Sequence, residues 1–456
     1  MSATPAAGEG RAQTGIAGLD QILSGGLPRN RLYLVQGNPG SGKTTAGLQF
    51  LLEGRRRGES GLYVTLSETA EELQGVARSH GWDLEGIRIY ELAPGEEALQ
   101  GDYTLFHPSE MELSRTTQGV LDVVEEIKPT RVVFDSLSEM RLLARDPLRY
   151  RRQILALKQF FIGRRCTVVL LDDRTADVAD LQLESLAHGV IDLEQLAPEY
   201  GAERRRLRVK KLRGVSYRGG FHDFKIATGG LVVYPRLIAS EHRGSFAQGT
   251  VSSGIAELDE LLGGGPERGS STLITGPAGP GKTSIAVNYL LAAVARGETA
   301  AFYSFEEGLA TLSARARGLG WDLEGAMKTG RLVIEFVNPA ELSPGEFAHD
   351  VQRAVDEKGA RVVVMFASAN RDEAVFPEPD RFDVRRENSK QNLAFGRGEH
   401  FCIGVALARK EAAIAFETLL EGTRDLRLSP GKNDFAHVPS FILRGLKQLF
   451  VELTPA

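Results

Sequence analysis

Two glycine-rich segments have the residue types and spacing that bind nucleotide phosphates. They read Gly37-Asn-Pro-Gly-Ser-Gly-Lys43-Thr44 and Gly276-Pro-Ala-Gly-Pro-Gly-Lys282-Thr283, and both match G-x-x-x-x-G-K-[ST] completely. We expect both in the strand–turn–helix context that this motif requires, with a strand directly before each loop. The glycines let backbone N–H groups point at phosphate oxygens, the lysine contacts the β- and γ-phosphates, and the hydroxyl holds Mg²⁺. The residues predicted to bind ATP and Mg²⁺ are Gly37, Gly40, Ser41, Gly42, Lys43, Thr44 and Thr45 in the first segment and Gly276, Gly279, Gly281, Lys282, Thr283 and Ser284 in the second.

An acidic residue stands where a further metal ligand is expected. Asp135 ends the apolar run Val132–Phe134, and a carboxylate at such a strand tip holds Mg²⁺ through water. We therefore predict that Thr44 and Asp135 hold the metal together. The alternative is a helix cap, the commoner role of an aspartate that follows a strand. The corresponding residue of the second copy is Met365, which cannot act on magnesium.

Glutamates follow two further apolar runs. Glu68 comes after Tyr63–Ser67, and Glu306 and Glu307 come after Phe302–Phe305. A carboxylate placed there orients the water that attacks the γ-phosphate, and Glu68 is the candidate in the first site. Spacing alone favours almost equally a solvated carboxylate or a charge in the first turn of a helix.

A parallel sheet is needed to position these side chains. Strands alternating with helices predict an α/β fold in which helices cover both faces of a mostly parallel sheet. The predicted strands are Arg31–Gln36, Gly61–Leu66, Arg131–Phe134 and Cys166–Leu171, with an amphipathic helix over Thr44–Glu53.

The chain also contains an internal repeat. Thr14-Gly-Ile-Ala-Gly-Leu-Asp20 recurs as Ser253-Gly-Ile-Ala-Glu-Leu-Asp259, and the same offset of 239 residues relates Lys43 to Lys282. A constant offset indicates duplication of one domain, but nothing after Met365 resembles residues 135–245. The predicted organisation is a flexible N-terminus over 1–13, a complete domain over 14–245, a truncated copy over 246–364 and a different segment over 365–456.

Residues 14–245 resemble the ATPase domain of the KaiC-type circadian clock proteins of the RecA-like superfamily, and residues 253–364 resemble its first half. The motifs that carry the resemblance are the phosphate-binding loop, Gly15-Ile-Ala-Gly-Leu-Asp20, Val132-Val-Phe-Asp-Ser136 and Lys210-Lys-Leu-Arg-Gly214. The resemblance implies a hexameric ring with ATP between subunits, in which Lys211 and Arg213 stabilise a neighbour's γ-phosphate. The alternative is a basic surface strand. The family's Ser/Thr autokinase phosphosites lie late in the second domain, in the missing part, so autophosphorylation is not expected.

A second resemblance covers the C-terminal segment. Phe395-Gly-Arg-Gly-Glu-His400-Phe-Cys402-Ile-Gly404 matches F-G-x-G-x-H-x-C-x-G, the heme-binding loop of cytochrome P-450 monooxygenases. The resemblance implies a mainly α fragment with a helix over Ile403–Leu420, in which Cys402 ligates heme iron. A lone cysteine is more often a buried apolar residue.

The same family's oxygen-activating helix and Glu-x-x-Arg brace have no counterpart between Val251 and Met365, so a working monooxygenase is not expected. The run Arg361–Val364 suits a strand of both families. We therefore hypothesise that two unrelated genes are joined there.

Composition excludes several other classes. The 456 residues carry a net charge of −5, with 42% apolar and 25% charged residues and two cysteines. These values exclude coiled-coil, disordered and disulfide-framework proteins and fit a cytoplasmic protein. Membrane insertion is not expected, and the arginine runs favour solvated helix faces over nucleic-acid binding.

Three hypotheses remain. The leading one is ATP hydrolysis by the first domain, with Lys43, Glu68, Lys211 and Arg213 as catalytic residues. The second is a heme-thiolate oxidoreductase acting through Cys402. The third is a regulatory interaction module in which ATP binding, rather than turnover, sets assembly, with a protein signalling partner.

Overall fold

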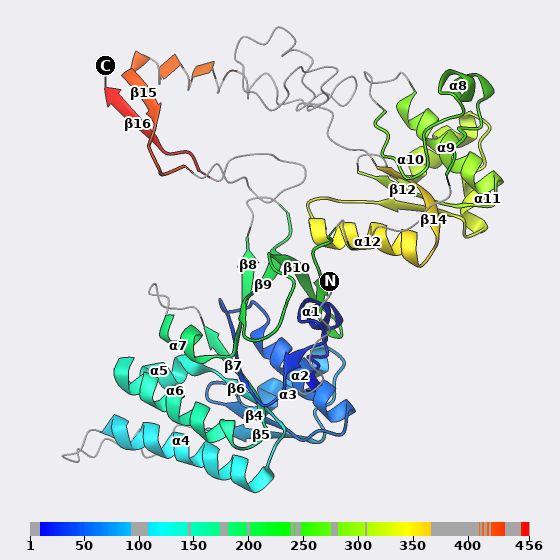
Figure 1. Ribbon diagram of the computed structural model, residues 1–456. Helices are drawn as coiled ribbons and strands as arrows, with labels where there is room; N and C mark the ends of the chain where they lie inside the picture. The colour runs from blue at the N-terminus through cyan, green and yellow to red at the C-terminus, as the bar shows by residue number, and fades with distance from the viewer. Residues whose placement is uncertain are drawn as a thin grey trace. The chain divides into compact units, whose positions relative to one another are not determined.

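The computed structural model describes residues 10–92, 108–144, 147–173, 181–197, 201–238, 241, 248–274, 281–305, 308–365, 410, 413–414, 417–418, 421–433 and 448–455 (Figure 1). The chain divides into two compact units, Met1–Ile238 with Gly345–His349 and Ala239–Pro344 with Asp350–Ala456. No helix in these described ranges has the length and the apolar content needed to span a bilayer.

A nine-stranded sheet forms the first unit, in the order β11-β10-β9-β8-β3-β7-β6-β4-β5. The strands from β8 to β5 run parallel, and β9, β10 and β11 extend the sheet as antiparallel neighbours. The four strands predicted from the sequence are confirmed as β3, β4, β6 and β7. The bounds are β3 (Leu32–Gly37), β4 (Gly61–Thr65), β5 (Ile87–Glu91), β6 (Arg131–Asp135), β7 (Thr167–Asp173), β8 (Gly189–Leu196), β9 (Arg204–Leu212), β10 (His222–Ala227) and β11 (Gly230–Tyr234), with a separate pair β1 (Arg11–Ala12) and β2 (Leu27–Pro28).

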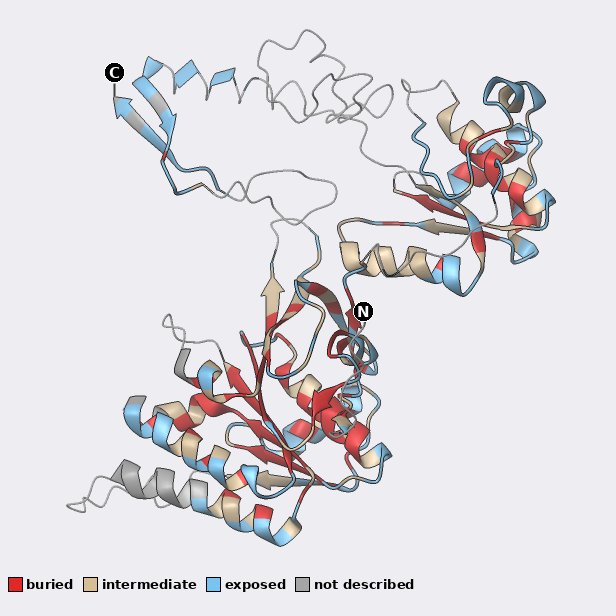
Figure 2. Ribbon diagram, viewed as in Figure 1, coloured by how far each residue is buried: buried red, intermediate tan, exposed pale blue. Residues whose placement is uncertain are grey.

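Helices cover both faces of this sheet, and the central strands between them are buried (Figure 2). Strand β3 shows why: Tyr33 and Val35 face one hydrophobic core, and Leu32 and Leu34 face the other. The first core includes α1 (Ala17–Ile22), α2 (Lys43–Arg56) and α3 (Ala70–Ser79), and the second includes α4 (Pro108–Ile127), α5 (Leu137–Ala144), α6 (Pro147–Ile162) and α7 (Leu181–Leu186).

A buried arginine ties β6 to α2. The Arg131 side chain is fully buried, and its guanidinium donates to the carbonyl oxygens of Phe50 at 2.8 Å and Gln13 at 2.6 Å. It also pairs with Glu59 and lies over the Phe50 ring, 4.5 Å from the ring centroid. The strand that ends in Asp135 is thereby fixed against the helix that begins with Lys43.

The second unit repeats the first half of this architecture. Helices α8, α9 and α10 begin and end 239 residues after α1, α2 and α3, which confirms the duplication inferred from the sequence. Its parallel sheet, β13-β12-β14, reproduces the order β5-β4-β6. The bounds are α8 (Ala256–Leu261), α9 (Lys282–Ala295), β12 (Thr299–Ser304), α10 (Leu309–Gly318), α11 (Leu323–Lys328), β13 (Leu332–Phe336), α12 (Pro344–Asp356) and β14 (Ala360–Met365).

The expected strand before the second phosphate-binding loop is not formed at residues 271–274, so this part of the prediction is wrong. In the first unit the equivalent strand, β3, is hydrogen-bonded on both sides, to β7 and β8. The described residues of the second unit contain no counterpart of either neighbour. Leu273 is accordingly 56% exposed.

Two antiparallel strands, β15 (Thr423–Leu428) and β16 (Val451–Pro455), are described in the C-terminal segment. Most of the predicted helix over Ile403–Leu420 lies outside the described residues. Its described positions, residues 410, 413–414 and 417–418, are helical.

Candidate nucleotide site

The phosphate-binding loop of the first unit joins β3 to α2. Gly40 and Gly42 have φ angles of 78° and 94°, which glycine adopts readily. A Cβ on Gly37 would lie 2.4 Å from the Leu193 carbonyl oxygen, so the backbone needs glycine there too. Ser41 Oγ is buried and has no hydrogen-bond partner among the described residues. The loop thus brings backbone N–H groups and an unpaired hydroxyl to a helix N-terminus, where phosphates bind.

Lys43, the first residue of α2, points back over the loop. Its ammonium donates to the Gly37 and Asn38 carbonyl oxygens, both at 3.0 Å. It also forms an ion pair of 2.7 Å with Asp173, the last residue of β7. The lysine charge is therefore held at the carboxyl edge of the sheet, beside the phosphate-binding loop.

Thr44 and Asp135 are in direct contact, as expected of two residues that hold one metal ion. Thr44 Oγ1 donates to Asp135 Oδ2 at 3.0 Å, and the Tyr63 hydroxyl donates to the same oxygen at 2.5 Å. Burial raises the pKa of the Asp135 carboxyl, against the lowering effect of these hydrogen bonds and of Lys43. A hydroxyl and a carboxylate are oxygen ligands of the kind Mg²⁺ prefers, so this pair fits the metal. Thr45, the next residue of α2, is buried.

Glu68 lies just beyond β4 and is held by its backbone. Its N–H donates to Thr65 Oγ1 at 3.0 Å, and the Thr65 hydroxyl donates to its carbonyl oxygen at 2.7 Å. Its Oε2 is buried with no hydrogen-bond partner among the described residues. Burial, followed by the negative charge of Asp135, raises the pKa of this carboxyl. An unpaired carboxylate oxygen beside Asp135 is suited to binding a water molecule.

Sequence reasoning missed two residues of this cluster, Tyr63 and Asp173. Asp173 pairs in register with Gly37, so β7 delivers its carboxylate to the edge where the phosphate-binding loop starts. The signal was present, because two aspartates directly follow the predicted strand Cys166–Leu171 and the ends of parallel strands meet at one edge.

Lys211 and Arg213 lie at the other end of the sheet. Arg213 N–H donates to the His188 carbonyl at 3.0 Å, and His188 N–H donates to the Leu32 carbonyl at 2.7 Å. Arg213 is therefore level with the start of β3, about 16 Å from its end at Gly37 given the rise of roughly 3.3 Å per strand residue. Neither residue reaches the phosphate-binding loop of its own chain.

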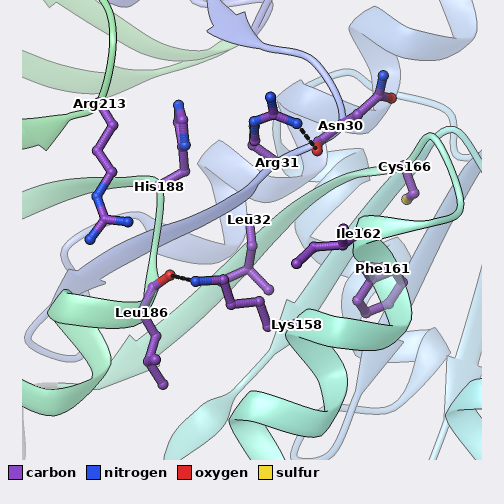
Figure 3. A pocket seen from close by; sticks show the side chains of 10 residues that line it. All are labelled: Asn30, Arg31, Leu32, Lys158, Phe161, Ile162, Cys166, Leu186, His188 and Arg213. Atoms are coloured by element: carbon purple, nitrogen blue, oxygen red, sulfur yellow. Dashed lines mark hydrogen bonds between the residues drawn. The ribbon is translucent and has the colours of Figure 1, made fainter.

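A basic pocket of about 260 Å³ adjoins Arg213 (Figure 3). Arg213 Nη2 donates to the Ser185 carbonyl at 2.9 Å, and Lys158 Nζ donates to the Leu186 carbonyl at 2.8 Å. Burial, with the nearby charges of Arg213 and Lys158, lowers the pKa of Lys211. No acidic side chain lines the pocket, whose residues are Asn30, Arg31, Leu32, Lys158, Phe161, Ile162, Cys166, Leu186, His188 and Arg213.

The second loop is described only from Gly281, whose φ of 98° repeats that of Gly42. Lys282, Thr283 and Ser284 open α9 as Lys43, Thr44 and Thr45 open α2. Gly276, Gly279, Glu306 and Glu307 lie outside the described residues, as does Cys402.

The pairing of β14 corrects one sequence assignment. Met365 is level with Tyr303, whereas Asp135 is level with Thr65, whose counterpart is Ser304. A register shift between Thr299 and Ala300 moves the correspondence by one residue, so that Met365 is not level with Ser304 and does not stand in place of Asp135. The next residue in the sequence, Phe366, lies outside the described residues, and neither Met365 nor Phe366 has a carboxylate that could act as this metal ligand.

Comparison with known proteins follows this division. The family model described as KaiC matches residues 12–238 and 251–366. The chain belongs to the KaiC family of ATPases. The first unit, with its α/β sheet, is the RecA-like domain of this family, and the second stretch of the family match, residues 251–366, begins in the second unit. A cytochrome P-450 family model matches residues 354–428 and overlaps the KaiC match at β14.

Curated members of the KaiC family align with most of the chain. The circadian clock oscillator protein KaiC of Parathermosynechococcus lividus is 32% identical over 336 residues, which cover 71% of this chain and 60% of the relative. The circadian clock protein KaiC3 of a Synechocystis strain is 29% identical and covers 71% of this chain and 65% of the relative. The chain thus spans less than two thirds of the length of these two relatives.

Proposed function

We propose that this KaiC-family chain binds ATP with Mg²⁺ in its first unit and hydrolyses it. The observation that carries the proposal is the contact between Thr44 and Asp135, 3.0 Å apart, beside Lys43 at the start of α2. When bound, Mg²⁺ on these two residues neutralises charge on the phosphates. The loop N–H groups and Lys43 orient the triphosphate, and Glu68 orients a water molecule in line with the γ-phosphate.

Phosphate release from ATP by the full chain tests this proposal. Lys43→Ala is expected to lower turnover by about 100-fold or more, because it removes the main charge that contacts the transferred phosphoryl group. Lys282→Ala is the matched control, because its site has no counterpart of Asp135, and it is expected to retain most of the turnover. Equal loss in both variants, or no loss in Lys43→Ala, would reject the assignment.

We further propose that Lys211 and Arg213 act on ATP bound to a neighbouring copy, so that the active assembly is a ring. Their distance from the loop of their own chain and the absence of acidic side chains in the adjoining pocket support this role. Such a head-to-tail interface forms a ring when the rotation between neighbouring copies closes on itself. Mass photometry with ATP and with EDTA is expected to show assembly with nucleotide, and a monomer under both conditions would contradict the ring.

Nucleotide-dependent assembly also suits the third hypothesis, in which ATP binding rather than turnover sets assembly. Autophosphorylation is not part of the proposal, because the described chain lacks the later strands of the second domain. We also propose a cytoplasmic location, because the sequence has only two cysteines and so offers no disulfide framework. Burial raises the pKa of the Cys166 thiol to about 12, so that thiol is unreactive.

For the C-terminal segment we propose descent from a cytochrome P-450, joined to the ATPase near residue 364 within β14. The overlap of the two family matches at residues 354–366 supports a shared strand. Amplification of genomic DNA across codon 364 tests the join, and two separate reading frames would show that the genes are not fused. Heme bound by Cys402 remains an alternative function, and a thiolate-type Soret band in the reduced, CO-treated protein would establish it.

A further inference from the structure

Lys43 has two competing anionic partners. Its ammonium is paired with Asp173 at 2.7 Å, yet the same ammonium is the group that contacts the β- and γ-phosphates in phosphate-binding loops. The single ammonium group of Lys43 cannot form full-strength interactions with a carboxylate and a phosphate at the same time. A stronger Lys43–Asp173 ion pair therefore lowers the affinity of the site for nucleotide.

Asp173 also has a second partner that can hold it without Lys43. Ser138 Oγ, on α5, donates to Asp173 Oδ2 at 3.2 Å and is itself hydrogen-bonded to the Ser136 hydroxyl. Ser136 directly follows Asp135, the proposed metal ligand. The carboxylate thus lies between the lysine of the loop and a pair of buried hydroxyls on the segment that leaves β6.

On the basis of the proposed ATP site, we propose that Asp173 is a positioning residue that discriminates ATP from ADP. Without nucleotide, Asp173 holds Lys43 against the loop. When ATP binds, the Lys43 ammonium contacts the γ-phosphate instead, and Asp173 remains hydrogen-bonded to Ser138. Asp173 and the γ-phosphate are both negative and compete for the same ammonium. Asp173 therefore lowers the affinity of the site for ATP more than its affinity for ADP. The residue thereby tunes which nucleotide the site holds.

Isothermal titration of the full chain with a non-hydrolysable ATP analogue and with ADP, both with Mg²⁺, tests the role. All variants carry Lys282→Ala, so that only the first loop is measured. Asp173→Asn is expected to bind the ATP analogue about tenfold more tightly and ADP less than about threefold more tightly, since one nearby negative charge is removed. Asp173→Glu keeps the charge and is expected to restore the original ratio of affinities.

Asp172→Asn is the matched control, because the Asp172 carboxylate is paired with Arg141 at 2.7 Å and not with Lys43. It is expected to leave the ratio of ATP to ADP affinity unchanged. If Asp173 were merely structural, its replacement would weaken the binding of both nucleotides equally. That result, or an unchanged ratio of ATP to ADP affinity, overturns the inference. Failure of the parent Lys282→Ala chain to bind either nucleotide would instead overturn the proposed ATP site.

Discussion

Replacing Asp135 by asparagine is expected to change stability and activity in opposite directions. Both hydrogen bonds to this side chain, from Thr44 and from Tyr63, end on the same oxygen, Oδ2. An amide oxygen in that place can accept both, so the substitution preserves the local packing. It removes only the charge, which the metal needs and which burial disfavours.

The sign follows from the raised pKa of Asp135. A carboxyl whose pKa is higher in the folded state than in the unfolded state destabilises the fold once it is ionised. We expect Asp135→Asn to be more stable than the parent by about 1 kcal/mol at neutral pH, the scale seen when a buried charge is replaced by a neutral group. This gain should shrink as the pH falls through the folded pKa toward the unfolded value of 3.8.

The assay is thermal unfolding with EDTA and without nucleotide, because Mg²⁺ would stabilise the charged parent. A gain of about 1 kcal/mol corresponds to a Tm increase of roughly 2–4 °C for a domain of this size. Turnover by the same protein should fall by about 100-fold or more with the loss of the metal ligand. A lower Tm together with retained hydrolysis would refute both the electrostatic argument and the metal role.

Two further substitutions test the neighbouring residues. Glu68→Gln should lower turnover about 100-fold while leaving ATP affinity within about threefold, because a water-orienting carboxylate acts in the chemical step. A titration that shows a loss of ATP affinity as large as the loss of turnover would contradict that role. Because the pKa of Glu68 is raised, turnover of the parent should decline on acidification at a higher pH than an ordinary carboxyl would give. Arg131→Met should destabilise the first unit by about 3 kcal/mol, since it removes the donor to two buried carbonyl oxygens and leaves Glu59 with Arg29 alone. An unchanged Tm would show that this network does not hold β6 to α2.

The sequence predicted most where one motif fixes local geometry. The loop from Gly37 to Thr44 carries its own turn and helix start, and Asp135 follows a strand that must lie parallel to β4, so their contact could be anticipated. The helices of the second unit could be placed because one offset relates both copies.

The remainder depends on pairing between distant segments. Asp173 joins the site only because β7 pairs with β3 in a register that brings it level with Gly37. The one-residue shift between Thr299 and Ala300 arises from strand pairing and leaves no mark in the sequence. The strand expected before the second loop is not formed at residues 271–274 because its predicted sequence has no neighbours to pair with in the described chain.

The central claim is that the first unit hydrolyses ATP with Lys43 from one copy and Arg213 from the next. The most direct test mixes two inactive chains, Lys43→Ala and Arg213→Ala, and measures phosphate release. In a ring of random composition about a quarter of the interfaces combine an intact loop with an intact Arg213, so the equal mixture should recover about a quarter of the parent rate. A mixture no more active than its separate components would contradict the claim.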